Sequence, residues 1–496
     1  MDKTESYPTI FYVTLAAVVL FAATAVATSV HLPVSTNNPQ AQAAIDRGLF
    51  LYYAYDGDDA ARMFELAAAL DPRLAMAFWG VALASGPDLN TPMTAGRFER
   101  AARAVRQAAA VATLPPARDQ ELVVLMGRRY RGSFADWRSD DAAYRDGMLR
   151  FARASGDENV ALLAAEALLE GGGLAWSGGA PAAVESREAL ELVTRILRDD
   201  PKSAMANHLC IHLYDLAPDR RPARQCAQRL DAAAFPPEAE HLAHMPAHYW
   251  IETGDYAAAV ASSDRAFELL ERLPGGLDGE HVRRYAKHDV GVGYSAAMML
   301  GNYAVARVWA LRMEGVFDQD FDAITALRFG RYADAYAADP GAFAGESVRG
   351  WAALRLGHAA EARALAKRVA GEDLTHGYMA QLFLAEAATA DGTPGDATRW
   401  IERARDDQRA NFTEELIPLF PADEVLGGIY LRYGGYAHAV AAFSEALARY
   451  PNDPRALYGL AAALSAQGQA AQAVAVRSRF QVEWKDADTG IADALP

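Results

Sequence analysis

The chain has 496 residues, of which 52% are hydrophobic, and its formal net charge is −16 at pH 7. This composition supplies enough apolar side chains for a large core. Nucleic-acid binding calls for a basic face, and a chain this acidic shows no sign of one, so we exclude nucleic acid as a partner.

An uncharged segment of 21 residues covers positions 10 to 30. A helix of that length can cross a bilayer. The same segment contains Ala25-Val26-Ala27, a pattern that a signal peptidase could cut. Lys3 is the only basic side chain ahead of it, so the positive region of a signal peptide is weak and an uncleaved anchor is favoured.

We therefore expect residues 1–34 to form a membrane anchor or signal segment, and residues 35–496 to form one domain outside the cytoplasm, in a bacterial periplasm. Membrane contact would be made through residues 10–30.

A pattern of paired helices begins near residue 60. The segment "DAARMFELAAALDP" places Ala60, Phe64 and Ala67 at helical spacing and ends at Pro72. Similar units recur along the chain, and no segment shows the alternation of a strand. The chain from about residue 40 onward is therefore predicted to consist of helical hairpins.

The glycine-rich stretch at residues 170–181 interrupts these units around a single Trp176. It can be read as a lid over a groove or as a long flexible turn.

Seven of the eleven histidines fall within 81 residues, and six of these are candidate ligands, of which the first two are His208 and His212. An α-helix turns about 100° per residue, so these two and Asp215 share one helical face. Imidazole is a common ligand of zinc, copper and iron, and a carboxylate beside it suits zinc or non-haem iron. The alternative is that each ring is simply a packed side chain bonded to a neighbouring carbonyl.

A second helix carries His241, His244 and His248 on one stripe, interrupted by Pro246. Proline inside a helix removes a hydrogen bond, so the helix must kink there or begin late. Such departures from regular structure concentrate at functional sites. His288 follows as a sixth candidate ligand.

The only two cysteines, Cys210 and Cys226, are separated by 16 positions across a short turn. Cys210 points away from His208 and His212 on its helix, so it should not join them on a metal. The two cysteines either form a disulfide between antiparallel helices or act as small buried hydrophobic residues.

The clearest repeat lies near the C-terminus. It contains a set of small and aromatic residues at regular spacing: Gly434, Tyr436, Ala439, Phe443, Ala446 and Pro451. Gly468 and Ala473 follow at the same offset of 34 residues. This pattern resembles the tetratricopeptide repeat. We therefore predict an all-α fold, a right-handed superhelical solenoid.

The histidine segments "NHLCIH" and "HMPAHYWIETGDY" resemble a bacterial family of tetratricopeptide-repeat proteins that carry NHxxIH followed by HMPxHxYxxxGxY. The resemblance marks a set of positions in this chain: Asn207, His208, His212, Asp215, His244, Met245, Pro246, His248 and Tyr256. Later segments of that family often read HNxHF, whereas this chain has "HDVGV", with Gly291 in place of the second histidine. The family has no firmly assigned reaction, so the resemblance implies a fold and a histidine site.

Counting positions within the repeats places two histidine pairs at equivalent positions of adjacent repeats. These pairs are His208 with His212 and His244 with His248. We expect these four imidazoles to converge on one divalent transition-metal ion, which the sequence leaves open between zinc, copper and iron. Asp215 would orient a ligand or act as a base.

Two functions follow from these patterns. The first is a metal-dependent protein outside the cytoplasm, including a metal-dependent oxidoreductase. The second is a scaffold without enzymatic activity that binds a peptide or protein partner in its concave groove.

Overall fold

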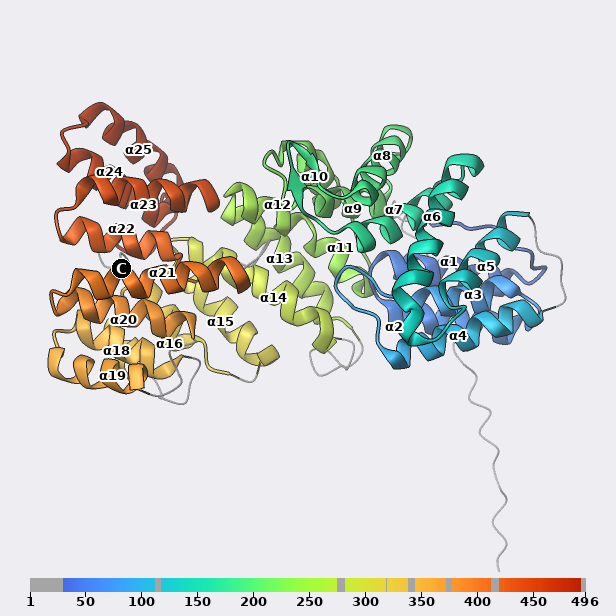
Figure 1. Ribbon diagram of the computed structural model, residues 1–496, viewed down its shortest axis with the longest axis horizontal. Helices are drawn as coiled ribbons and strands as arrows, with labels where there is room; N and C mark the ends of the chain where they lie inside the picture. The colour runs from blue at the N-terminus through green and yellow to red at the C-terminus, as the bar shows by residue number, and fades with distance from the viewer. Residues whose placement is uncertain are drawn as a thin grey trace, which may run out of the picture.

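The computed structural model describes residues 30–111, 117–273, 282–317, 319–337, 344–371, 377–411 and 419–491. Within these ranges the chain is a succession of paired helices, in which each helix packs against its neighbours in sequence (Figure 1). The predicted all-α solenoid is confirmed.

The first part of the chain contains these α-helices: α1 (Pro39–Tyr53), α2 (Gly57–Leu70), α3 (Ala75–Ala84), α4 (Ala95–Ala110), α5 (Ala117–Arg129), α6 (Trp137–Ser155), α7 (Glu158–Gly172), α8 (Val184–Asp199), α9 (Ala204–Tyr214), α10 (Arg224–Asp231), α11 (Glu240–His244), α12 (Pro246–Thr253) and α13 (Tyr256–Leu270). The second part contains these: α14 (Val282–Met299), α15 (Tyr303–Phe317), α16 (Asp322–Arg328), α17 (Tyr332–Tyr336), α18 (Gly345–Arg355), α19 (Ala359–Gly371), α20 (Tyr378–Ala390), α21 (Pro394–Asn411), α22 (Ala422–Arg432), α23 (Tyr436–Arg449), α24 (Pro454–Ala466) and α25 (Ala470–Glu483). Short 3₁₀ helices lie at Phe134–Asp136, Arg221–Ala223 and Pro237–Ala239.

The glycine-rich stretch forms the one two-stranded sheet of the described residues, an antiparallel pair of β1 (Trp176–Ser177) and β2 (Ala180–Pro181). The indole Nε1 of Trp176 donates a hydrogen bond to the carbonyl of Leu213, at 2.9 Å. The hairpin is therefore attached to the end of α9.

The repeat unit has the same internal packing at both ends of the chain. The ring of Phe64 on α2 lies between Gly48 on α1 and Gly80 on α3. The ring of Phe443 on α23 lies in the same way between glycines of α22 and α24, again 16 positions before and after it. A side chain at any of these glycines would overlap the ring, so the sequence positions that let neighbouring helices approach are the same in distant repeats.

The C-terminal repeats return to the middle of the chain. The hydroxyl of Tyr256 on α13 donates to the carbonyl of Pro451, at 2.8 Å and 195 residues away. The carboxylate of Asp488 accepts hydrogen bonds from the backbone amides of Tyr303 and Ala304, at 2.7 and 3.1 Å, at the start of α15. Contacts of this range join the end of the solenoid to its centre.

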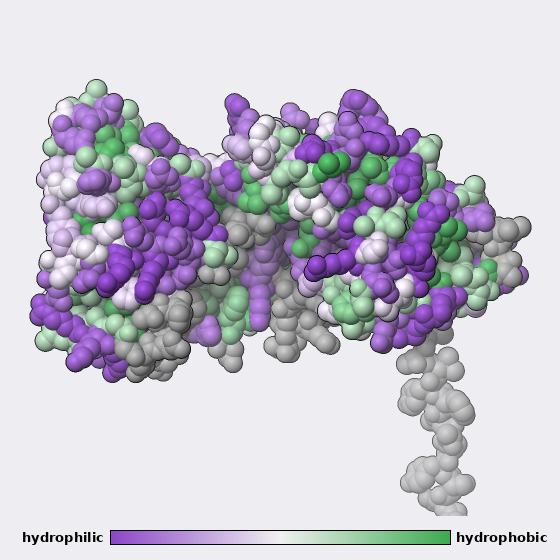
Figure 2. Space-filling model, in the orientation of Figure 1, coloured by the Kyte–Doolittle hydropathy of each residue, from purple (hydrophilic) through white to green (hydrophobic). Residues whose placement is uncertain are grey.

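No helix among the described residues is long and apolar enough to cross a membrane. The predicted anchor at residues 10–30 falls outside the described residues except for Val30. On the face shown in Figure 2, hydrophilic side chains predominate, and the surface is hollowed between the C-terminal helices and the region of α10 to α12.

Candidate metal centre

Three helical segments that follow one another along the chain bring the six clustered histidines together. α9 carries His208 and His212, the α11–α12 segment carries three histidines, and α14 carries His288. All are buried except His288, which is half-buried. We call the following six residues the histidine cluster: His208, His212, His241, His244, His248 and His288.

Pro246 divides the middle helix, as its position in the sequence predicts. α11 ends at His244, and α12 begins with Pro246 as its first residue. Because proline has no amide hydrogen, the ladder of backbone hydrogen bonds is broken at this position. The break lies between His244 and His248, two neighbours on the same face.

The first group within the cluster contains His208, His212 and His241, each with a ring nitrogen within 4.8 Å of the others. The ring centroids of His208 lie 4.9 Å from His212 and 5.1 Å from His241. The Nε2 atom of His212 is buried and makes no hydrogen bond within the described residues.

The second group contains His244, His248 and His288. Nε2 of His248 lies 3.0 Å from Nε2 of His244 and 3.2 Å from Nε2 of His288. Three nitrogens of three different rings thus face one point.

The four histidines His208, His212, His244 and His248 lie together as predicted, since the centroids of His212 and His248 are 5.3 Å apart. Their ligand atoms, however, do not meet at one point: they divide between two groups of three histidines, and only His212 and His248 share a further group, with Asp215. The reason is that the middle helix presents a third histidine: His241 joins the pair of α9, and the two later histidines join α14.

Asp215 lies behind one ring of each group. Its Oδ2 is 2.9 Å from Nδ1 of His212 and 3.6 Å from Nδ1 of His248. Burial opposes ionisation of this carboxyl, but the hydrogen bond with His212 and the contact with His248 outweigh it and hold its pKa below the usual range. An ionised carboxylate only accepts hydrogen bonds, so His212 donates through Nδ1 and directs Nε2 into the cluster.

Asp289, next to His288, was not singled out by the sequence. Its Oδ1 is 3.7 Å from Nδ1 of His241 and 3.6 Å from Nε2 of His244. Both carboxylate oxygens are buried and accept no hydrogen bond within the described residues. Burial raises the pKa of Asp289 to about 8. The neighbouring positions of His288 and Asp289 could have marked Asp289 as a candidate, but the sequence does not show which way its carboxylate points.

Burial also lowers the pKa of four cluster histidines well below 6.5, and the neighbouring imidazoles lower it further; these are His208, His241, His244 and His288. Those rings are therefore neutral at pH 7, which is the form that binds a metal ion.

Tyr55 packs against the first group and was also missed by sequence reasoning. Its ring centroid lies 4.4 Å from that of His208 and 5.2 Å from that of His241. The residue is 2% exposed and has φ 61°, in the left-handed region that non-glycine residues rarely occupy. Strained backbone of this kind persists where the surrounding packing determines it, often at functional sites.

Cys210 and Cys226 form a disulfide with Cα atoms 6.4 Å apart, which confirms that prediction. The bond joins α9 to α10. It therefore braces the helix that carries His208 and His212 without taking part in the cluster.

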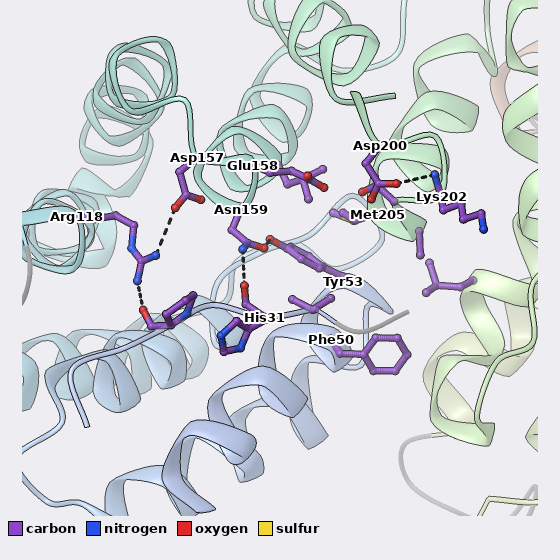
Figure 3. Close-up of a pocket in the computed structure, with 16 residues that line it drawn as sticks. His31, Phe50, Tyr53, Arg118, Asp157, Glu158, Asn159, Asp200, Lys202 and Met205 are labelled. Carbon is purple, nitrogen blue, oxygen red and sulfur yellow. Dashed lines mark hydrogen bonds and ion pairs between the residues drawn. The ribbon is translucent and has the colours of Figure 1, made fainter. Parts of the chain in front are cut away.

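A pocket of about 640 Å³ lies beside the cluster, between α1, α7, α9 and the segment that begins at Val30 (Figure 3). The amide of Asn159 joins its walls, because Nδ2 donates to the carbonyl of His31, at 3.0 Å, and Oδ1 accepts from the hydroxyl of Tyr53, at 3.2 Å. Met205 and Leu242 line it, each close in sequence to a cluster histidine, but no cluster histidine lines it. The pocket and the cluster are separate sites.

The chain is similar in part to known proteins. Residues 430–477 match the tetratricopeptide repeat model. A search of curated protein sequences found no match. Among solved structures, the APC/C hetero-tetramer Cut9-Hcn1 matches with 12% identity and a TM-score of 0.35, covering 79% of this chain and 77% of that chain. Yeast Tom70 matches with 11% identity and a TM-score of 0.27, covering 92% and 94%.

The tetratricopeptide-repeat domain of P58(IPK) also matches, with 13% identity and a TM-score of 0.23, over 86% of this chain and 98% of that chain. The repeat model covers α23 and α24, and the packing of glycines around Phe443 in this region recurs around Phe64 at the other end of the described chain. Residues 430–477 are therefore a tetratricopeptide repeat.

Proposed function

We propose that this repeat protein binds a transition-metal ion in its histidine cluster. The observation that carries the proposal is the approach of three Nε2 atoms, with His248 at 3.0 Å from His244 and 3.2 Å from His288. One Nε2 carries either a single proton or a single lone pair, so His248 cannot complete good hydrogen bonds to both rings. A cation between the three rings accepts all three lone pairs.

The spacing fits such an ion. Zinc–nitrogen bonds of about 2.0 to 2.1 Å in tetrahedral geometry place ligand nitrogens about 3.3 Å apart. The observed separations are close to this value before any ion draws the rings together.

The ligand set is compatible with zinc, copper or iron, all of which accept imidazole. An ion held by three imidazoles keeps an open position for water or substrate. The site therefore supports a metal-dependent enzyme, and an oxidoreductase where the ion is copper or iron. Asp215 acts here by orienting His212, because it touches Nδ1 and not the converging nitrogens.

Two features support a location outside the cytoplasm. The uncharged segment at residues 10–30 is long enough to act as an anchor or signal. The disulfide between Cys210 and Cys226 is of a kind that persists in oxidising compartments.

A second candidate function is binding of a protein partner by the repeats, as solenoids of this kind commonly do. Its specific support is the apolar surface of the terminal helix α25, where Val474 is 64% exposed and Val482 is 62% exposed. The hollow on the face in Figure 2 offers a further surface for such a partner.

The metal proposal is tested by elemental analysis of the full chain purified without a histidine tag. We expect bound metal that survives dialysis, and its loss in the double variant His244→Ala/His248→Ala. His438→Ala, an exposed histidine on α23, is the control and should keep the metal. Wild-type protein that takes up no zinc, copper or iron would leave the scaffold function as the better account.

A further inference from the structure

The histidine cluster contains more donors than one ion can use. Zinc and copper take about four ligands from a protein, and three in an open site. Six imidazoles face this one region of the interior, in two groups of three that share no member, and a third group formed by His212, Asp215 and His248 joins one ring of each. A single ion in either group would leave three buried rings of the other group without a ligand role.

Two carboxylates connect the groups. Asp215 contacts His212 of the first group and His248 of the second, through Nδ1 in both cases. Asp289 lies between His241 of the first group and His244 of the second, at 3.7 and 3.6 Å. Each carboxylate thus touches one ring from each group.

The roles of the two carboxylates differ. Asp215 approaches Nδ1 of both rings, on the side away from the converging Nε2 atoms, so it orients ligands. Asp289 approaches the converging Nε2 of His244, and neither of its oxygens accepts a hydrogen bond within the described residues. A buried carboxylate in this position needs a cationic partner.

Resting on the proposed function, we propose that the cluster is a dinuclear centre: two transition-metal ions lie side by side, each held by one group of three imidazoles, and Asp289 is the carboxylate that bridges them. This assignment gives every histidine of the cluster a ligand role. It also gives the buried carboxylate of Asp289 a cationic partner, the two metal ions.

The charge balance supports the pairing. Two divalent ions bring four positive charges into the interior, and the two carboxylates offset half of them. A water molecule bound between two such ions loses a proton readily and offsets another. Tyr55 packs against the first group, edge-on to His208 and stacked on His241.

Burial limits what the centre can bind. Five of the six histidines are at most 3% exposed, and only His288 is half-buried. Any further ligand of the two ions is therefore a small molecule of the size of water or dioxygen.

The test is the number of ions bound by the full chain. The metal-free protein is titrated separately with Zn²⁺ and Cu²⁺, and bound metal is measured after dialysis. We expect two ions in the wild type, one in His208→Ala, one in His288→Ala and two in the control His438→Ala. One ion in the wild type would overturn the dinuclear centre and leave the proposed function standing, and no ion would overturn both.

A second measurement does not depend on variants that fold. In wild-type protein loaded with Cu²⁺, neighbouring ions couple magnetically, so the electron paramagnetic resonance signal should account for far fewer than two spins per chain. Two full, non-interacting spins would show that the ions are distant from each other and would overturn the proposal.

Discussion

Single residues set the orientation of the imidazoles in the histidine cluster. His212 is held by a hydrogen bond of 2.9 Å from its Nδ1 to Asp215, and this leaves Nε2 directed at the other rings of its group. Carboxylates behind metal-binding histidines raise the basicity of the ligand and lock its tautomer. Tyr55 packs against rings of the same group, edge-on to His208 and stacked on His241.

The substitution Asp215→Asn keeps the size of the side chain and removes its charge. We expect metal affinity to fall about 10- to 100-fold, because the amide stabilises the required tautomer less well. Competition with a coloured chelator measures the change. Asp219→Asn, at an exposed position four residues later, should leave the affinity as it was. Equal affinities of wild type and Asp215→Asn would show that Asp215 does not support a ligand.

At the scale of helices, close approach and cross-linking decide which elements carry the site. The disulfide from Cys210 on α9 to Cys226 on α10 closes a loop with a sequence separation of 16. Elsewhere, glycines opposite an aromatic ring allow neighbouring helices to pack tightly, as Gly48 and Gly80 do around Phe64.

Cys226→Ala should lower the free energy of unfolding by about 3 kcal/mol, the contribution expected of a disulfide that closes a loop of this length. Urea denaturation followed by circular dichroism measures it. Adding a reductant to the wild type should reproduce the loss and should not affect the variant. A wild type insensitive to reductant would contradict the expectation.

Gly80→Ala should destabilise the protein by about 1 to 3 kcal/mol, because the new methyl group would overlap the ring of Phe64 and force helix α3 away from α2. Gly96→Ala is the matched control in helix α4, since nothing lies within 4 Å of the added atom. It should be neutral or slightly stabilising. Thermal unfolding of both variants compares them, and equal losses would count against the packing argument.

At the scale of the whole molecule, the C-terminal repeats are joined to the centre by buried charges. Arg328 on α16 and Glu424 on α22 are both 0% exposed and form a two-point ion pair at 2.6 and 2.8 Å. Arg455 on α24 donates to the carbonyls of Met298 and Arg328, at 3.1 and 3.3 Å. These bonds join segments up to 157 residues apart in sequence.

Removing one partner leaves a buried charge unpaired. Arg328→Met should therefore cost about 3 to 5 kcal/mol of stability. Arg349→Met removes a comparable pair with Glu361 that is about one-third exposed, at 33% and 37%, and should cost far less, because solvent screens the pair. Chemical denaturation gives both values. If Arg328→Met cost less than about 1 kcal/mol, the buried pair would not hold the C-terminal repeats in place.

Much of the fold could be predicted because helical repeats are local. The spacing of Gly434, Phe443 and Gly468 specifies a helix, a turn and the next helix within a few dozen residues, and the described structure has that order. Likewise, the positions of His208 and His212 on one face, and the break at Pro246, follow from helix geometry alone. Location outside the cytoplasm and the ends of the two predicted segments, 1–34 and 35–496, stay predictions.

The helical repeat, the clustering of the histidines and the possibility of a bond between Cys210 and Cys226 follow from the sequence alone, because each depends on residues close together along the chain. Only the folded structure shows that His241 groups with the histidines of α9, that Asp289 lies between the two groups and that Tyr55 packs against the first group. These contacts arise where helices from separate repeats meet. Their geometry depends on how the helices pack against one another, and the local spacing of residues does not specify that packing.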